Sequence, residues 1–400
     1  MNWFMQIIWK IFGEIAKILY GNPAKEFFVV AITWTQNLTA QSIIVQYFFD
    51  KLISSSVIIN KEHLIMWDKT IPHWKFGGFI YSLHKSLALA KAKWYQVAIV
   101  VLDYQTVSNK SYTSIDIDLC ILTEITNKYP SDKLNGLEKT KNEFKNIFLS
   151  IIDNNKVNKL WVFPKDNKNW YMIADEVGLD SSINYWIIGS AGVQAQIQFQ
   201  DINWSNIELS YLWQSISQKI HYNTISDIYA LLGGVATMCL LGVQWSDILS
   251  YMVTLPELWG IRLTTLQTST QQKFWFIKRS YLDEWIKIIN ETKATNTIVV
   301  ISFDDKNKAI IEDFFSQTGQ NVDYYIITHT LYENKHKMEY IAFINNLLSE
   351  EQEWITYFEI PERKYALQFA SKIYNNNDAV FVLTNENVFS QDKKIIKSLK

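Results

Sequence analysis

Short apolar runs alternate with stretches of helical periodicity over the first part of the chain. Runs rich in β-branched and aromatic residues predict buried strands at residues 27–33, 56–60, 97–103 and 116–123. The spacing of apolar positions between these runs predicts helices at residues 39–52, 78–92 and 137–152. A polar loop is expected around Thr70 and Pro72. Strands that alternate with helices of this length indicate a parallel sheet with helices on both faces.

The pattern changes between residues 159 and 221, where short alternating runs predict an antiparallel β section. A small-residue helix is predicted next, at residues 227–242. The strand and helix alternation then returns, with strands predicted at residues 297–303, 324–328 and 379–384 and helices at residues 308–318, 337–348 and 364–374. The fold class predicted is α/β, with a central domain of P-loop type whose sheet is mostly parallel and a smaller doubly wound α/β C-terminal domain.

Three segments are expected: a helix over residues 1–20, a central domain over 21–242 and a C-terminal domain over 243–400. Lys10, Glu14 and Lys17 interrupt the apolar N-terminal segment at helical spacing, which predicts an amphipathic helix packed on the central domain. Contact with a membrane surface is the alternative, because Trp3 and Phe12 belong to the apolar face. No run of about 18 uncharged apolar residues predicts a membrane-spanning helix.

The composition of the chain limits the classes of partner and of site that we expect. A net charge of −2 gives no reason to expect binding to nucleic acid. Cys120 and Cys239 lie in apolar runs and are predicted to be core residues in a reducing compartment, so the protein is expected to be cytoplasmic. The six histidines are scattered, and none has the spacing of a zinc site or a catalytic triad.

Tryptophan and glycine occur in unusual numbers. The chain has 16 Trp and 13 Gly, although glycine normally makes up about 7% of residues. Several tryptophans stand where turn chemistry favours glycine, namely Trp34, Trp204, Trp245 and Trp259. We therefore hypothesise that some UGA codons, read as glycine by the source organism, are translated here as tryptophan.

A candidate phosphate-binding loop follows the first predicted strand. Residues 31–40 read AITWTQNLTA, so a strand leads into a threonine-rich turn and then into a helix. This turn resembles the TGTNGKTT pattern of the Mur ligase family, with Thr33, Thr35 and Thr39 at matching positions.

Further segments resemble the same family in the same order. Residues 115–148 are similar to the region around its DHLDYHG sequence, residues 226–243 to its NVYNALAAIAAALALGI helix, and residues 255–266 to the entry of its last domain. The resemblance covers roughly residues 14–392 and is nearest to the UDP-N-acetylmuramoyl-tripeptide synthetase (MurE-type) branch. The usual N-terminal UDP-binding domain has no room in this chain.

The resemblance implies an ATP-dependent acid–amino-acid ligase of peptidoglycan stem-peptide synthesis, which uses ATP and Mg²⁺ and binds a muramyl-peptide precursor. The residues at the family's functional positions are Thr33, Thr35, Asn37, Thr39 and Arg262 for the nucleotide, Asp103 and Asp132 for magnesium, and Lys145 for the lysine that is carbamylated in the family. For Asp132 a solvated acid, for Lys145 a plain surface lysine and for Arg262 a surface ion pair are the alternatives.

The sequence departs from the family where phosphate charge has to be neutralised. Leu38 stands in place of the loop lysine, Trp34 and Asn37 in place of glycines, and Ala40 in place of a threonine. The loop needs backbone N–H groups close to the phosphates and a lysine on the outer ones. Ligation is therefore expected to be weak or lost. The alternative function is a non-catalytic protein of the same fold that holds a nucleotide or a partner ligase.

Overall fold

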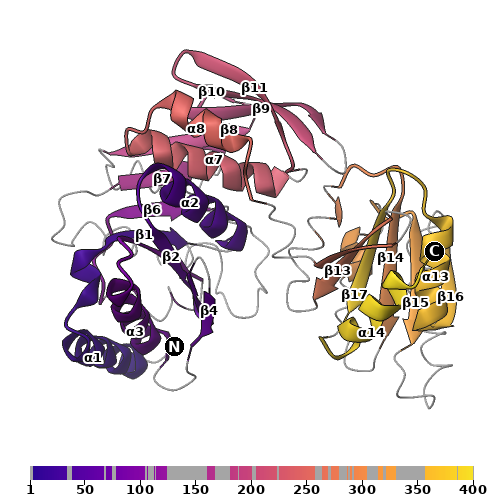
Figure 1. Cartoon of the computed structure of the whole chain (residues 1–400), viewed down its shortest axis with the longest axis horizontal. Helices are drawn as coiled ribbons and strands as arrows, with labels where there is room; N and C mark the ends of the chain where they lie inside the picture. The colour runs from indigo at the N-terminus through magenta and orange to yellow at the C-terminus, as the bar shows by residue number, and fades with distance from the viewer. Residues whose placement is uncertain are drawn as a thin grey trace. The chain divides into compact units, whose positions relative to one another are not determined.

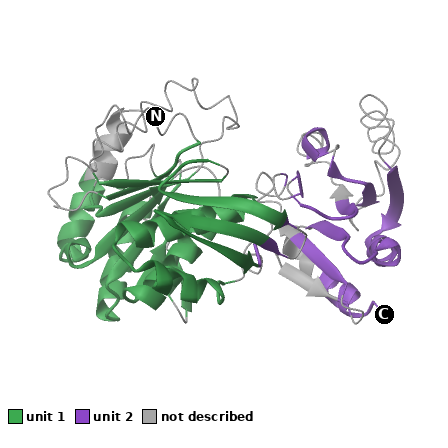
Figure 2. Cartoon of the chain, turned by 90° about the horizontal axis from the view of Figure 1, so that it is seen from above, with its two compact units in different colours: residues 1–199, 206–220, 225–256 green, residues 200–205, 221–224, 257–400 purple. Residues whose placement is uncertain are grey.

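The computed structural model describes most of the chain. The described residues are 3–33, 38–66, 69–73, 78–103, 106, 112, 114–123, 160–166, 181–187, 189–200, 204–222, 225–256, 264–268, 272–278, 286, 289–290, 292–303, 314–318, 321–329, 356–384 and 386–399. They form two compact units (Figure 2), of which the first holds residues 1–199, 206–220 and 225–256, and the second residues 200–205, 221–224 and 257–400.

One large sheet runs through unit 1 (Figure 1), in the strand order β11-β10-β9-β8-β7-β6-β1-β5-β2-β3-β4. Its strands are β1 Phe28–Thr33, β2 Ser56–Ile59, β3 His63–Met66, β4 Lys69–Pro72, β5 Val97–Leu102, β6 Leu119–Leu122, β7 Leu160–Pro164, β8 Ser182–Ile187, β9 Val193–Gln200, β10 Ser205–Tyr211 and β11 Gln214–Ile220. The pairs from β2 through β5, β1, β6, β7 and β8 to β9 are all parallel.

Helices cover both faces of this sheet, as expected when central strands are buried on each side. The helices of unit 1 are α1 Trp3–Leu19, α2 Leu38–Leu52, α3 Gly78–Ala92, α7 Ile225–Leu240 and α8 Trp245–Met252, with the short 3-10 helix η1 Pro23–Glu26. Alternate strand residues such as Val29, Ala31 and Val100 pack with Leu83 and Leu87 of α3. The other face is covered by α2 and α7.

Close packing of α2 against α7 sets the position of the first turns of α2. A β-carbon at Gly234 would lie 2.6 Å from Cγ2 of Ile44, so only a residue without a side chain allows this approach. Gln41 is buried at the same contact, beside Gly233. The helix that follows β1 is therefore held rigidly over the end of the sheet.

The helix α1 packs on α3, where the Tyr20 and Tyr81 hydroxyls are hydrogen-bonded at 2.9 Å. Ala16 is buried, whereas Ile11, Ile15 and Ile18 are exposed. An amphipathic helix against the central domain is thus what forms at the N-terminus. Within the described residues, no helix is long and apolar enough to cross a bilayer.

Two expectations for unit 1 were wrong in detail. The loop expected around Thr70 is the strand β4, which pairs antiparallel with β3 at the end of the sheet. The section from residue 159 is not antiparallel throughout, because β7, β8 and β9 continue the parallel ladder. The expected antiparallel pairing is present between β10 and β11, which are joined by a two-residue turn.

Unit 2 has its own sheet, in the order β12-β13-β17-β14-β15-β16. Its elements are β12 Thr264–Gln267, β13 Lys273–Lys278, β14 Thr297–Phe303, β15 Tyr324–His329, β16 Thr356–Glu362, α13 Arg363–Ile373, β17 Ala379–Thr384 and α14 Glu386–Lys397. All pairs are parallel except β12 with β13. The predicted α/β class, with a mostly parallel main sheet and a second parallel sheet, is confirmed. The helix predicted at residues 337–348 lies outside the described residues, as does the one at 137–152.

Candidate functional site

The candidate phosphate loop lies between a buried strand and a helix. β1 ends at Thr33 and α2 begins at Leu38, so the strand and the helix expected on either side of residues 34–37 are both present. Thr33 is fully buried, and its Oγ1 donates a hydrogen bond to the Leu102 carbonyl oxygen of β5 at 3.1 Å. The threonine therefore fixes the start of the turn and is not directed at a ligand by its hydroxyl group.

Asp103 follows β5 at the same edge of the sheet. β1 and β5 are parallel neighbours with Thr33 opposite Leu102, so Asp103 comes one residue beyond the start of the turn. Its Oδ1 accepts hydrogen bonds from the backbone N–H of Thr106, at 2.7 Å, and from the Thr106 hydroxyl. Asp103 is partly buried, and both of these hydrogen bonds come from uncharged donors.

The end of β6 closes the other side of β1. Thr123 donates from its backbone N–H to the Thr33 carbonyl oxygen at 3.1 Å, and from its hydroxyl to the same oxygen at 3.3 Å. Three neighbouring strands therefore bring Thr33, Asp103 and Thr123 to one carboxyl edge. In parallel α/β sheets this edge is where ligands bind.

The first turn of α2 carries the main departure from a phosphate site. Leu38 and Thr39 are both partly exposed, and Leu38 is the first residue of the helix. The N-terminus of a helix attracts anions through its free N–H groups and its dipole. The apolar side chain of Leu38 adds no positive charge to that attraction.

Further polar residues at the same sheet edge were missed by the sequence reasoning. Lys165 and Asp166 directly follow β7. The Lys165 ammonium donates to the Ser190 carbonyl oxygen at 2.5 Å, and the Tyr229 hydroxyl of α7 donates to Asp166. Their position after a buried strand in a parallel region was the available signal, but this region was taken to be antiparallel.

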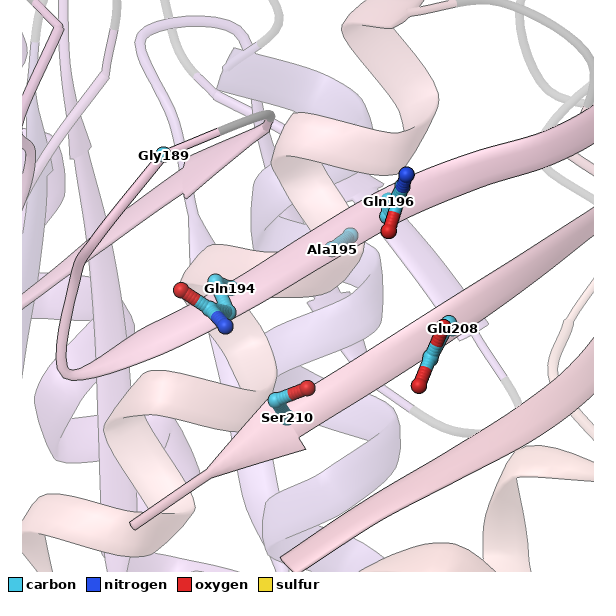
Figure 3. Close-up of a pocket in the computed structure, with 6 residues that line it drawn as sticks. All are labelled: Gly189, Gln194, Ala195, Gln196, Glu208 and Ser210. Carbon is cyan, nitrogen blue, oxygen red and sulfur yellow. The ribbon is translucent and has the colours of Figure 1, made fainter. Parts of the chain in front are cut away.

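A separate polar pocket lies on the sheet face formed by β9 and β10 (Figure 3). Its volume is about 440 Å³, and it is lined by Gly189, Gln194, Ala195, Gln196, Glu208 and Ser210. Alternation along each strand turns these amide, hydroxyl and carboxylate groups to one side, while Ile207 and Leu209 are buried on the other. With no lysine or arginine in its lining, the pocket is not suited to phosphate.

Several expected site residues lie outside the described residues: Thr35, Asn37, Asp132, Lys145 and Arg262. Among the described residues, no group of three or more His, Cys, Asp or Glu side chains is placed to hold a metal ion. Cys120 and Cys239 are free and buried. Burial raises the pKa of both thiols, that of Cys239 to about 12, which fits core residues and not nucleophiles.

Comparison with solved structures shows that Mur ligases and folylpolyglutamate synthases share this fold. No protein-family model matches the sequence, and no curated protein sequence matches it. A UDP-N-acetylmuramoyl-L-alanyl-D-glutamate–2,6-diaminopimelate ligase superposes with a TM-score of 0.70 at 11% identity, over 93% of this chain and 77% of that chain. MurF from Acinetobacter baumannii gives 0.66 at 11% identity, over 96% and 79% of the two chains.

Folylpolyglutamate synthase from Mycobacterium tuberculosis, in complex with ADP and AMPPCP, gives a TM-score of 0.66 at 10% identity. The match covers 93% of this chain and 92% of that chain. Both Mur ligases and folylpolyglutamate synthases are therefore similar to this chain in fold. At such low identities the comparisons establish the fold, and the residues must carry any argument about activity.

Proposed function

We propose that the chain is a Mur-ligase-like protein that binds ATP with magnesium at the carboxyl edge of β1 and β5, and that its ligation activity is weak or lost. The observation that carries this proposal is the strand–turn–helix from Thr33 to Leu38, with Asp103 on the neighbouring parallel strand. Phosphate loops use this context, since helix N–H groups face the phosphates while an acid on the next strand faces the metal.

The residues at this edge are suited to hold part of the proposed ligand, ATP with magnesium. Magnesium prefers oxygen ligands, which the Asp103 carboxylate and the Thr39 hydroxyl supply. When bound, ATP in this fold class supplies the phosphoryl group that activates a carboxylate. Asn37 in the turn, Arg262, and Asp132 as a second metal ligand complete the proposed set. Lys145 is the proposed carbamylated lysine.

The likeness in fold to Mur ligases supports a proposal for the substrates. We propose a carboxylic acid and an amine, as in the joining of an amino acid to a muramyl-peptide precursor, and we propose that the chain is of the MurE type. The cytoplasm is the proposed site of action. Contact of the exposed face of α1 with a membrane surface is a subsidiary proposal that vesicle co-sedimentation tests.

Thermal unfolding with and without ATP and magnesium tests nucleotide binding. A ligand present at 100 times its dissociation constant adds about 2.7 kcal/mol to stability, so Tm is expected to rise. The variant Leu38→Lys is expected to bind ATP more tightly than the parent chain because it restores a cation at the helix N-terminus, whereas Leu38→Met is the matched apolar control. No rise in Tm with either the parent or Leu38→Lys would contradict the proposal.

A non-catalytic nucleotide-holding or ligase-holding protein is the second candidate, and Leu38 is the observation that favours it. Removing one preorganised charge-stabilising group costs roughly 3–4 kcal/mol of activation free energy in a comparable case. ADP release in the presence of ATP, magnesium, a muramyl-dipeptide precursor and amino acids separates the two. Binding without ADP release supports the non-catalytic protein, and ADP release supports the ligase.

A further inference from the structure

Two helices of unit 1 end in the same glycine-dependent motif. At the end of α7, the Gly242 N–H donates to the Cys239 carbonyl oxygen at 3.1 Å and the Val243 N–H to that of Met238 at 3.0 Å. Gly242 has φ 77°. The end of α1 repeats this pair of bonds, with Gly21 at φ 70°. The residue at positive φ is normally glycine, because a β-carbon is strained there.

The helix α3 ends in the same motif with a tryptophan in the glycine position. The Trp94 N–H donates to the Lys91 carbonyl oxygen at 2.9 Å, and the Tyr95 N–H to that of Ala90 at 3.2 Å. Trp94 has φ 65°. The backbone of this turn is therefore built as it is at Gly21 and Gly242.

Burial of the side chain does not compensate for the strain at Trp94. Its side chain is 86% exposed, so the indole gains little from burial. By contrast, Trp161 on β7 is 1% exposed and Trp275 on β13 is 4% exposed, and both stand in the middle of strands. Trp213, 100% exposed in the two-residue turn beside Leu212 at φ 53°, resembles Trp94 more than the buried pair.

One position expected from sequence to be a glycine site does not have this geometry. Trp245 is the first residue of α8 and has no positive φ, and its ring lies 5.6 Å from that of Tyr211. The backbone therefore does not require glycine at position 245. Trp204 directly follows residues outside the described part of the chain, and Trp34 and Trp259 lie outside it.

We propose that position 94 carries glycine in the protein made by its own cell, because a UGA codon there is read as glycine and not as tryptophan. Composition agrees, since 13 glycines in 400 residues are about 3% of the chain, below the normal glycine share of about 7%. We do not propose glycine at the core positions of Trp161 and Trp275, because glycine there would leave cavities.

The proposal that UGA codons are read as glycine also affects the candidate phosphate loop. Trp34 stands in the turn after β1, at a position where a phosphate loop needs glycine for close approach of its backbone. Glycine at position 34 would remove a bulky side chain from that turn without replacing the missing cation at Leu38. This consequence is independent of whether the chain binds ATP.

The codons themselves give the first test. Sequencing of the gene is expected to show UGA at codon 94 and UGG at codons 161 and 275. Peptide mass spectrometry of the protein from its own cell is expected to give a peptide lighter by the difference between tryptophan and glycine at position 94. UGG at codon 94, or a tryptophan-containing peptide from the native protein, overturns the proposal.

Stability provides a second test that does not need the native cell. Trp94→Gly is expected to raise Tm by about 2–4 °C, because it relieves the strain at positive φ. The matched change Gly242→Trp at the end of α7, where open space surrounds the glycine, is expected to lower Tm by a similar amount. An unchanged or lower Tm for Trp94→Gly, with a decrease for Gly242→Trp, would show that tryptophan belongs at position 94.

Discussion

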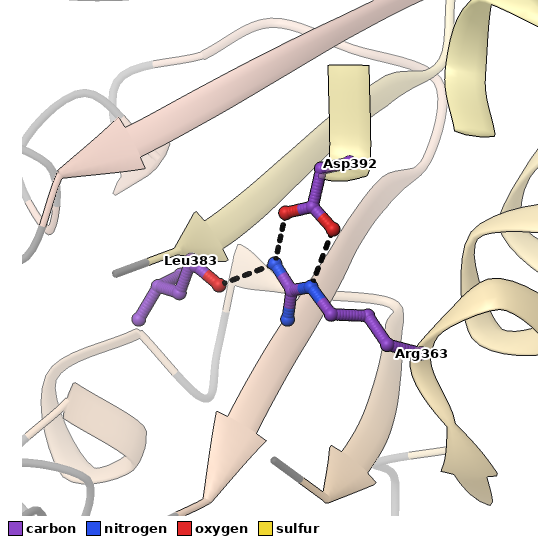
Figure 4. Close-up of polar contacts among 3 residues, drawn as sticks. All are labelled: Arg363, Leu383 and Asp392. Carbon is purple, nitrogen blue, oxygen red and sulfur yellow. Dashed lines mark hydrogen bonds and ion pairs between the residues drawn. The ribbon is translucent and has the colours of Figure 1, made fainter. Parts of the chain in front are cut away.

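The carboxyl edges of the two parallel sheets handle charge in opposite ways. In unit 2, Arg363 at the start of α13 forms two hydrogen bonds of 2.7 Å with the carboxylate of Asp392 on α14, and a third of 3.0 Å with the Leu383 carbonyl oxygen of β17 (Figure 4). In unit 1, among the described residues, Asp103 accepts its hydrogen bonds from the uncharged donors of Thr106. At the edge in unit 2, Arg363 and Asp392 neutralise each other. At the edge in unit 1, the Asp103 carboxylate is left able to bind a cation.

We therefore expect the charged residues of the two edges to have different roles, in stability for unit 2 and in binding for unit 1. Arg363 and Asp392 are buried, so each needs the other, and their role is to hold two helices and a strand together. Asp103 is partly exposed and sits beside a turn that leads into a helix N-terminus. Substitution of Arg363 or Asp392 should therefore change folding, and substitution of Asp103 should change ligand binding.

The largest effect is expected for Asp392→Ala. The change leaves the Arg363 guanidinium buried without its carboxylate, which typically costs about 3–5 kcal/mol of folding free energy. Urea denaturation should show the loss, and hydrogen exchange should locate it in α13, α14 and β17.

A double variant provides the control for this comparison. Arg363→Met combined with Asp392→Leu removes both charges and keeps apolar volume, so its stability should lie close to that of the parent chain. If Asp392→Ala and the double variant are equally destabilised, packing and not charge pairing holds this edge.

Acidification should weaken unit 1 through His84. This imidazole is fully buried on α3, and its Nε2 is hydrogen-bonded to the Ser114 hydroxyl at 2.9 Å. Burial, and secondarily the positive charge of Lys17, lowers the His84 pKa from 6.5 to about 4. The unfolded chain therefore takes up a proton at a higher pH than the folded chain does.

The stability contributed by neutral His84 is complete above pH 6.5 and is lost as the pH falls toward 4, by about 3 kcal/mol. Unfolding free energies measured across this range should fall more steeply for the parent than for His84→Asn. Equal slopes would mean that His84 titrates normally in the folded state.

The strands were predictable because their signals are local. β14 and β17 have the predicted bounds, and β1 and β5 differ by one residue, since continuous runs of buried β-branched residues have few alternatives. β4 was missed because Lys69 and Thr70 are exposed in an edge strand and lack that signal.

The candidate site was predictable only in part, because its contacts join residues far apart in sequence. The position of Asp103 at a strand end could be read directly. The contact of Thr123 with Thr33 and the pairing of Arg363 with Asp392 depend on strand order and helix placement. No local sequence pattern indicates which strands become neighbours in a sheet.

A moderate effect is expected for Thr33→Val. This change removes the hydroxyl that donates to the Leu102 carbonyl oxygen in a buried site, and a lost hydrogen bond of this kind costs about 1 kcal/mol. Thr123→Val should cost less, because the backbone N–H of Thr123 still binds the Thr33 carbonyl oxygen. Denaturation of both variants would show whether the Thr33 hydroxyl serves the fold, as its geometry indicates.

The smallest effect on stability, and the most informative for binding, is expected for Asp103→Asn. The amide oxygen can still accept the two bonds from Thr106, so the folding free energy should change by less than about 0.5 kcal/mol. An amide has no charge to offer magnesium, so the part of the ATP-induced rise in Tm that depends on magnesium should disappear. Asp116→Asn is the matched control, since this acid precedes β6 at the opposite edge of the same sheet and should leave the magnesium dependence intact. If both variants lost the magnesium dependence, or if neither did, the charge of Asp103 would not be what distinguishes the carboxyl edge of unit 1 from the rest of the molecule.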